Sequence, residues 1–235
     1  MNKHQNTNTN NFSHDKLQEK MFLVILSIFL ASLIIEIGFH FLLFKESGII
    51  IKYLQWFLYL DLSLAFLGGA IWHYLSYDIK NNCMTSMMLG MTLGMQVGMM
   101  IGAIIGATNG FFIGATTGVI LGVAAGAWAG YRNGSTMGIM QGFMSGVMGG
   151  TMGPMITVMM FSDHLNWFMP LYLVLNVIIL LFMSKMYFEE SVKNNEDTKI
   201  VNVSYSTIIF VAIIATVILT TIILFLPKSP FLAVI

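Results

Sequence analysis

The stretch GMTLGMQVGMMIG, residues 90–102, begins a run in which glycine occupies every fourth position as far as Gly150. Each residue turns an α-helix by about 100°, so a step of four residues overshoots one full turn by about 40°. Five such glycines in one helix form a stripe that drifts around the helix and faces two neighbours instead of one. We therefore predict that helices at 84–107, 111–131 and 135–161 contact their neighbours along glycine-lined grooves.

A lipid environment explains this use of glycine. Lipid tails are as apolar as leucine, so helices associate through van der Waals packing and weak hydrogen bonds, which small side chains permit. A glycine costs about 1 kcal/mol in a water-exposed helix, and this cost falls in a bilayer, where backbone groups are satisfied within the helix. A flexible set of gating helices is the alternative interpretation, and it does not exclude packing. The predicted packing glycines are Gly90, Gly94, Gly98, Gly102, Gly106, Gly114, Gly118, Gly122, Gly126, Gly138, Gly142, Gly146 and Gly150.

The composition excludes a soluble domain. Of the 235 residues, 57% are hydrophobic and 9% are charged, whereas soluble domains carry about 25% charged residues. The formal net charge of zero gives no indication of a nucleic-acid partner. The single cysteine, Cys83, excludes an internal disulfide and a cysteine-based metal cluster within one chain. No Ser–His–Asp spacing, HExxH motif or phosphate loop is present, so we do not expect an enzyme.

The chain contains about seven segments with the roughly 20 apolar residues that a spanning helix needs. These segments are 21–44, 52–75, 84–107, 111–131, 135–161, 165–187 and 203–226. We predict an all-α fold, a polytopic transmembrane helix bundle that forms one domain over residues 21–227. A disordered cytoplasmic tail is expected at 1–20, and a short C-terminal tail at 228–235.

The lysines and arginines predict the orientation of the bundle, because cytoplasmic segments carry an excess of them. With the N-terminus in the cytoplasm, the segments inside hold Lys3, Lys16, Lys20, Lys80, Arg132, Lys185, Lys193 and Lys199, and those outside hold Lys45, Lys52 and Lys228. This asymmetry predicts a plasma-membrane protein with a cytoplasmic N-terminus and an external C-terminus.

Methionine is concentrated in the predicted third and fifth helices. The chain has 20 methionines, and none lies between residues 101 and 136. Spacings of four residues place Met91, Met95 and Met99 on one face of the third helix. The same spacing aligns Met140, Met144, Met148 and Met152 on the fifth helix.

Two interpretations of these methionines stay open. Methionine is flexible and fills irregular gaps, such as those that glycine-lined grooves leave. Its thioether is also a ligand that suits Cu(I), and a column of weak sites is what conduction of an ion requires. Our leading hypothesis is a protein that handles a soft metal ion, Cu(I), by transport or sequestration through the seven methionines named above. It requires the sulfurs of the two helices to face each other inside the bundle.

Ionisable side chains within the membrane are candidates for a second site. Glu36 and His40 share a face of the first predicted helix, and Asp61 lies in the second. At 1.5 Å per residue, Glu36 and Asp61 lie at similar depths, roughly 23 and 21 Å from the inner boundary. We predict an outer polar site formed by these three residues, with His164 in the loop above the same leaflet. In the plainer interpretation, protonated carboxyls only hold the first two helices together.

Two further functions are compatible with these patterns. One is a structural or oligomerising glycine-zipper module, a scaffold for other membrane helices. The other is a proton-coupled transporter of small solutes that uses Glu36 and Asp61. In each case the expected partners are the lipid bilayer and a second copy of the chain or other membrane helices, and not nucleic acid.

The segments CMTSMMLGMTLGMQVGMMIGAIIGATNGFFIG and MQGFMSGVMGGTMGPMITVMMF, within residues 83–161, resemble uncharacterised Gly/Met-rich polytopic membrane proteins of bacteria. This resemblance implies a bacterial inner-membrane location and an association with copper handling. It carries no established activity and no assigned set of ligands.

Overall fold

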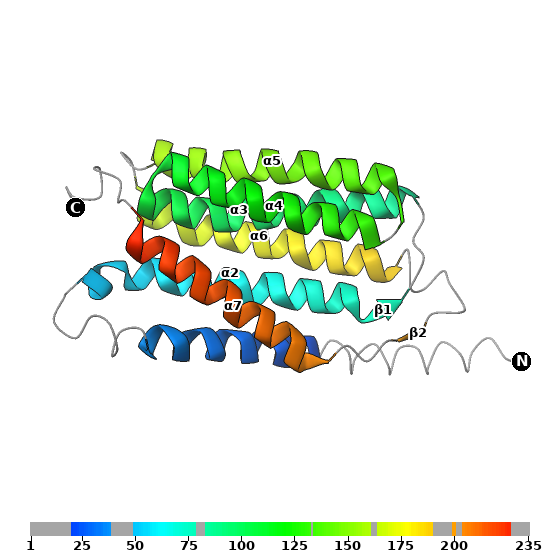
Figure 1. Ribbon diagram of the computed structural model, residues 1–235, viewed down its shortest axis with the longest axis horizontal. Helices are drawn as coiled ribbons and strands as arrows, with labels where there is room; N and C mark the ends of the chain where they lie inside the picture. The colour runs from blue at the N-terminus through cyan, green and yellow to red at the C-terminus, as the bar shows by residue number, and fades with distance from the viewer. Residues whose placement is uncertain are drawn as a thin grey trace, which may run out of the picture.

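The computed structural model describes residues 20–38, 49–78, 83–132, 134–160, 164–189, 199–200 and 204–226. These residues form an all-α bundle in which consecutive helices run in alternating directions (Figure 1). The helices are Lys20–Gly38, α2 (Ile49–Leu75), α3 (Cys83–Asn109), α4 (Phe111–Arg132), α5 (Thr136–Met159), α6 (Leu165–Tyr187) and α7 (Tyr205–Phe225). Two short strands, β1 (Tyr77–Asp78) and β2 (Lys199–Ile200), pair antiparallel at one end. The prediction of an all-α helix bundle is confirmed.

Six of these helices are long and apolar enough to cross a membrane, so the chain is an integral membrane protein. They are Lys20–Gly38, Leu54–Leu75, Cys83–Asn109, Phe111–Arg132, Leu165–Tyr187 and Ser206–Phe225. The remaining helix, α5, has 24 residues and runs alongside α3 and α4 (Figure 1). It is not among the six helices that meet both criteria. The first predicted span, 21–44, is described only as far as Gly38, and the predicted tail at 1–20 lies outside the described residues except for Lys20.

Helices α3, α4 and α5 pack backbone against backbone. A Cβ atom added to Gly94 would lie 2.8 Å from the Gly142 carbonyl oxygen and 3.1 Å from the Gly126 Cα. The glycines form five layers with one residue from each helix, and Pro154 takes the third place in the last layer. The layers are Gly90, Gly130 and Gly138; Gly94, Gly126 and Gly142; Gly98, Gly122 and Gly146; Gly102, Gly118 and Gly150; and Gly106, Gly114 and Pro154. From the first layer to the last, the residue numbers rise in α3 and α5 and fall in α4. Helices α3 and α5 therefore run parallel, and α4 runs antiparallel to both.

Two members of the glycine run form turns instead of helix contacts. Gly110 separates α3 from α4 with φ 98°, and Gly134 precedes α5 with φ 66°. Residues with a Cβ rarely adopt this left-handed conformation. The four-residue period therefore continues through both turns, and it places the three helices in register as the chain reverses.

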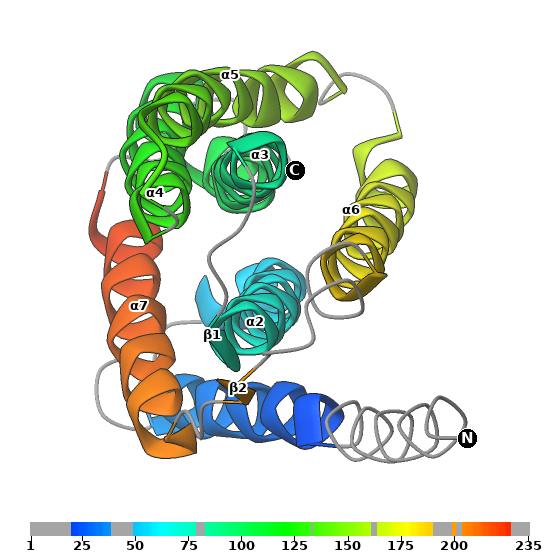
Figure 2. The ribbon, with the colours of Figure 1, turned by 90° about the vertical axis from the view of Figure 1, so that its right-hand side faces the viewer.

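The helix Lys20–Gly38, α6 and α7 lie around α2 (Figure 2). Helix α2 itself lies between α3 and the helix Lys20–Gly38. Ile25 and Ile28 of the N-terminal helix approach Gly69 and Gly68 of α2, and the Ile28 Cδ1 would lie 2.7 Å from a Cβ at Gly68. The pair Gly68–Gly69 lies outside the four-residue glycine run, and the sequence analysis did not identify it as a helix contact.

A single polar side chain closes the end of α7. The Asn109 amide, at the end of α3, donates to the carbonyl oxygens of Ile222, Ile223 and Leu226 at 3.2–3.4 Å. The last carbonyls of a helix have no partner within it, so Asn109 caps α7 from a neighbouring helix. This bond joins α7 to the end of the glycine-packed helices.

We predict that Gly142→Ala destabilises the bundle. A Cβ at residue 142 would meet the carbonyl carbon and oxygen of Gly126, which are backbone atoms and cannot rotate away. Overpacking of this kind costs about 1–3 kcal/mol. Gly38→Ala is the control, because a Cβ there meets nothing within 4 Å among the described residues. Equilibrium unfolding in detergent measures both, and equal stability of the two variants would contradict the close packing.

Candidate functional site

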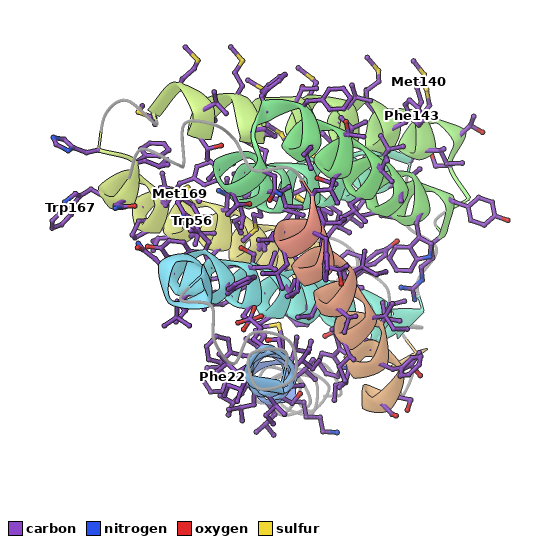
Figure 3. All side chains as sticks on the ribbon, turned by 60° about the vertical axis from the view of Figure 1, so that its left-hand side comes forward. Phe22, Trp56, Met140, Phe143, Trp167 and Met169 are labelled. Carbon is purple, nitrogen blue, oxygen red and sulfur yellow. The ribbon has the colours of Figure 1, made fainter. Side chains whose placement is uncertain are left out.

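The methionine row of α5 lies on the outer surface of the bundle. Met140, Met144, Met148 and Met152 are 60%, 52%, 57% and 43% exposed. Figure 3 shows Met140 pointing away from the other helices. On α3, Met91 is 48% exposed, and Met95 and Met99 are half-buried. The expected arrangement, with the sulfurs facing each other inside the bundle, is therefore wrong for a single chain, because the glycine side of each helix occupies the interior.

The methionine rows of α3 and α5 nevertheless lie beside one contact between these two helices. Gly149 of α5 packs on the backbone of Met95, and Gly153 packs on that of Met99. Met148 and Met152 each precede one of these glycines, so they lie beside the same line. The opposite side of this line is covered by α4, which contacts the glycines of both helices. We call Met95, Met99, Met148 and Met152 the methionine seam.

Gap-filling fits the buried methionines of the bundle directly. Met100, Met169 and Met183 are buried, which fits the packing role of this flexible side chain. The outward surfaces of α6 and α7 carry leucine, isoleucine, valine and phenylalanine instead. Exposed methionines concentrate on α5 and the adjoining side of α3, and none lies on the described parts of α6 and α7.

Two carboxyl groups meet where the N-terminal helix packs on α2. Glu36 faces Asp61, and Ser32 lies beside Asp61. Asp61 is fully buried. Neither oxygen of Asp61, nor Oε1 of Glu36, completes a hydrogen bond of good geometry with another described residue. The structure thus brings together two of the four residues predicted for the outer polar site.

The two predicted histidines are not part of this pair. His40 lies outside the described residues. His164 is exposed at the N-cap of α6 and makes no side-chain capping bond. Because Asp61 is enclosed at a helix interface and His164 lies at an open helix end, these two do not form one site in the structure.

A third polar cluster surrounds Arg132, which the sequence analysis identified only as a basic residue on the inside. Its guanidinium donates to the carbonyl oxygens of Tyr74, Leu75 and Tyr77 at 3.1–3.2 Å, and it lies 4.8 Å from the centroid of the Tyr74 ring. The Tyr74 hydroxyl in turn donates to the Ala129 carbonyl at 3.1 Å. Arg132 therefore caps α2 from α4, and its charge is favourable at this negative helix end.

Aromatic rings extend this cluster to α6. The Tyr187 ring centroid lies 5.4 Å from that of Tyr74 and 6.0 Å from that of Tyr77. His73 Nδ1 lies 3.0 Å from Ser184 Oγ. Burial, together with the nearby Tyr187, raises the pKa of Tyr77 to about 12. The Tyr77 phenol is therefore neutral at physiological pH and does not offset the charge of Arg132.

We predict that Arg132→Lys loosens the contact between α2 and α4. A lysine ammonium cannot reproduce the planar fork that reaches three carbonyls and stacks on Tyr74. Hydrogen bonds to charged groups contribute about 1.5–3 kcal/mol, so the free energy of unfolding should fall by about that amount. Lys185→Gln, which changes an exposed charge on the last turn of α6, is the control. Thermal unfolding that does not distinguish Arg132→Lys from wild type would contradict this capping role.

The chain matches no family model, and neither a curated protein nor a solved structure matches it. The described residues include no group of three or more His, Cys, Asp and Glu that would hold a metal.

Proposed function

We propose that the protein binds and handles a soft monovalent metal ion, Cu(I), at the methionine seam, on the surface of the bundle instead of in the interior that the sequence hypothesis required. The observation that carries this proposal is the concentration of exposed methionines along one contact between parallel helices. Met91, Met140 and Met144 extend the same rows toward the N-terminal ends of α3 and α5.

The chemistry of the seam suits such an ion. Thioether sulfur is a soft ligand that favours Cu(I) over hard cations such as Mg²⁺ or Ca²⁺. Neutral thioethers carry no charge to desolvate, so they remain compatible with a lipid-facing surface. Met140 and Met152 are twelve residues apart, which corresponds to roughly 18 Å along the helix axis. A row of weak ligands over this distance supports either sequestration or stepwise movement of the ion.

The glycine layers support this function by holding the two rows in register. The contacts between α3 and α5 are mostly backbone to backbone, and the side chains among them, such as Ser145 and Pro154, are small or rigid. In this proposal the glycine-zipper core is a rigid frame, and the methionines are the ligands that it presents.

A structural or oligomerising module is the second candidate function. The exposed methionine face of α5 favours it, because methionine side chains adapt to a partner surface. A second copy of the chain that docks through α5 would bring two methionine rows together.

We propose further that the protein resides in the bacterial plasma membrane with its N-terminus in the cytoplasm. The alternating helices place Lys20, Arg132 and Lys185 at one end of the bundle (Figure 1). Lysine and arginine prefer the cytoplasmic side, so this end is assigned to the cytoplasm.

The binding test compares Cu(I) retention by purified protein against a competing chelator under reducing conditions. We expect wild type to retain the ion and the Met95/Met99/Met148/Met152→Leu variant to lose it, because leucine keeps the volume and removes the sulfur. The control variant replaces Met21, Met169, Met183 and Met186 with leucine and should retain Cu(I). Equal retention by all three proteins, or by none, would refute the assignment. A variant that no longer binds Cu(I) but also changes oligomeric state would favour the second candidate.

The orientation test uses the single cysteine. Cys83 is exposed at the first residue of α3, at the end assigned to the cytoplasm. A membrane-impermeant maleimide should modify it in inverted vesicles and not in intact cells. A cysteine at Asn166, exposed in the first turn of α6, should show the reverse in a Cys83→Ser background. Modification of Cys83 in intact cells would invert the assignment.

A further inference from the structure

The interface between the N-terminal helix and α2 holds an acid pair without a visible counter-charge. Asp61 is fully buried, and both of its carboxyl oxygens lack a hydrogen bond to any other described residue. Glu36 faces it across the interface, and its Oε1 is buried and equally unpartnered. Burying a polar group without a hydrogen bond is costly, and a proton carried by one of the two facing carboxyls would supply a hydrogen bond between them.

Ser32 lies within reach of Asp61, but its hydroxyl already has a backbone partner. Ser32 Oγ donates to the Phe29 carbonyl at 3.0 Å, and Ser63 Oγ donates to the Tyr59 carbonyl at 2.7 Å. Their protons are directed at their own helices. Glu36 is the titratable group that faces Asp61 within the described part of the chain, where neither carboxyl forms an ion pair.

The electrostatics of two facing carboxyls determine what the pair can bind. Two negative charges a few ångströms apart repel strongly where the dielectric constant is low, and paired carboxyls do not both ionise readily. One proton between them turns the repulsion into an O–H···O hydrogen bond from one carboxyl to the other. A hard metal ion would need a fuller shell of oxygens, typically six or more, than the two carboxyls provide.

We propose that Glu36 and Asp61 form a proton-exchange site that couples protonation to the docking of the N-terminal helix on α2. With one proton the carboxyls attract each other across the interface, and without it they repel. No bond other than the carboxyl O–H forms or breaks, and the proton is exchanged with water.

The packing of the N-terminal helix makes it responsive to this change. In its apolar stretch, 17% of the residues are buried, against 72% for α3. Ile25 and Ile28 hold it at Gly69 and Gly68, nearer its N-terminus, while Glu36 lies near the other end of its described part. Loss of the shared proton should therefore loosen the Glu36 end first. This inference is independent of the methionine seam.

The test measures whether the pair exchanges a proton. In wild type reconstituted in vesicles, the infrared band of a protonated carboxyl should decrease as the pH is raised. In both Glu36→Gln and Asp61→Asn, this band should be absent, or it should decrease at a different pH. Glu189→Gln, at the exposed end of α6, is the matched control and should leave the band unchanged. A band that does not respond to pH in wild type, or that persists in both variants, would overturn the proposal.

A second measurement uses only the wild-type chain, in case the variants fail to fold. A hydrophobic carbodiimide modifies protonated carboxyls in membranes, and mass spectrometry locates the product. Modification of Glu36 or Asp61 should fall by about tenfold per pH unit above the midpoint of titration, whether or not sodium is present. Protection by sodium at constant pH would identify a metal-cation site instead. Modification at neither residue, or to the same extent at every pH, would indicate a static structural pair. Either of these results, or protection by sodium, would overturn the proposal.

Discussion

The close approach of three backbones, with no Cβ between them, is the constraint on which the structure depends. In the five layers, glycine Cα and carbonyl atoms of α3, α4 and α5 occupy the space that side chains would fill in an ordinary bundle. Helices in lipid gain little from the hydrophobic effect, so this contact area supplies their association. Asn109 and Arg132 then join the ends of these helices to α7 and α2.

The same constraint determines where the methionines lie. Met140, Met144, Met148 and Met152 stand two residues from packing glycines, and two residues correspond to a rotation of about 200°. A side chain in that position points away from the four-residue glycine stripe, although Met148 and Met152 also directly precede Gly149 and Gly153 and so lie beside the contact with α3. Met91, Met95 and Met99 follow glycines by one residue, about 100° around the helix, and therefore lie beside the contact. Both rows repeat every four residues, as the glycines do, so these angles hold along each helix.

The protein thus combines a rigid part and a loosely packed part with different chemistry. Backbone contacts fix α3, α4 and α5, and the thioethers lie on their outer surface. The N-terminal helix contacts α2 through two isoleucines and an acid pair, and most of its surface is exposed to the membrane. The proposed metal binding on the rigid part and the proposed proton exchange on the other part require no shared residue, so mutations can test each separately.

Helix periodicity and length are local properties, and for that reason the sequence by itself determined much of the architecture. It determined the all-α bundle, the helices that use glycine, the alignment of each methionine row on a single helix face and the similar depths of Glu36 and Asp61. Only the tertiary structure decided which neighbour covers each face. It placed the methionine rows outside, left His164 apart from the acid pair, and directed Arg132 and Asn109 to carbonyls at the ends of other helices. These contacts join residues more than 50 positions apart, and no local pattern encodes which helix end lies nearby.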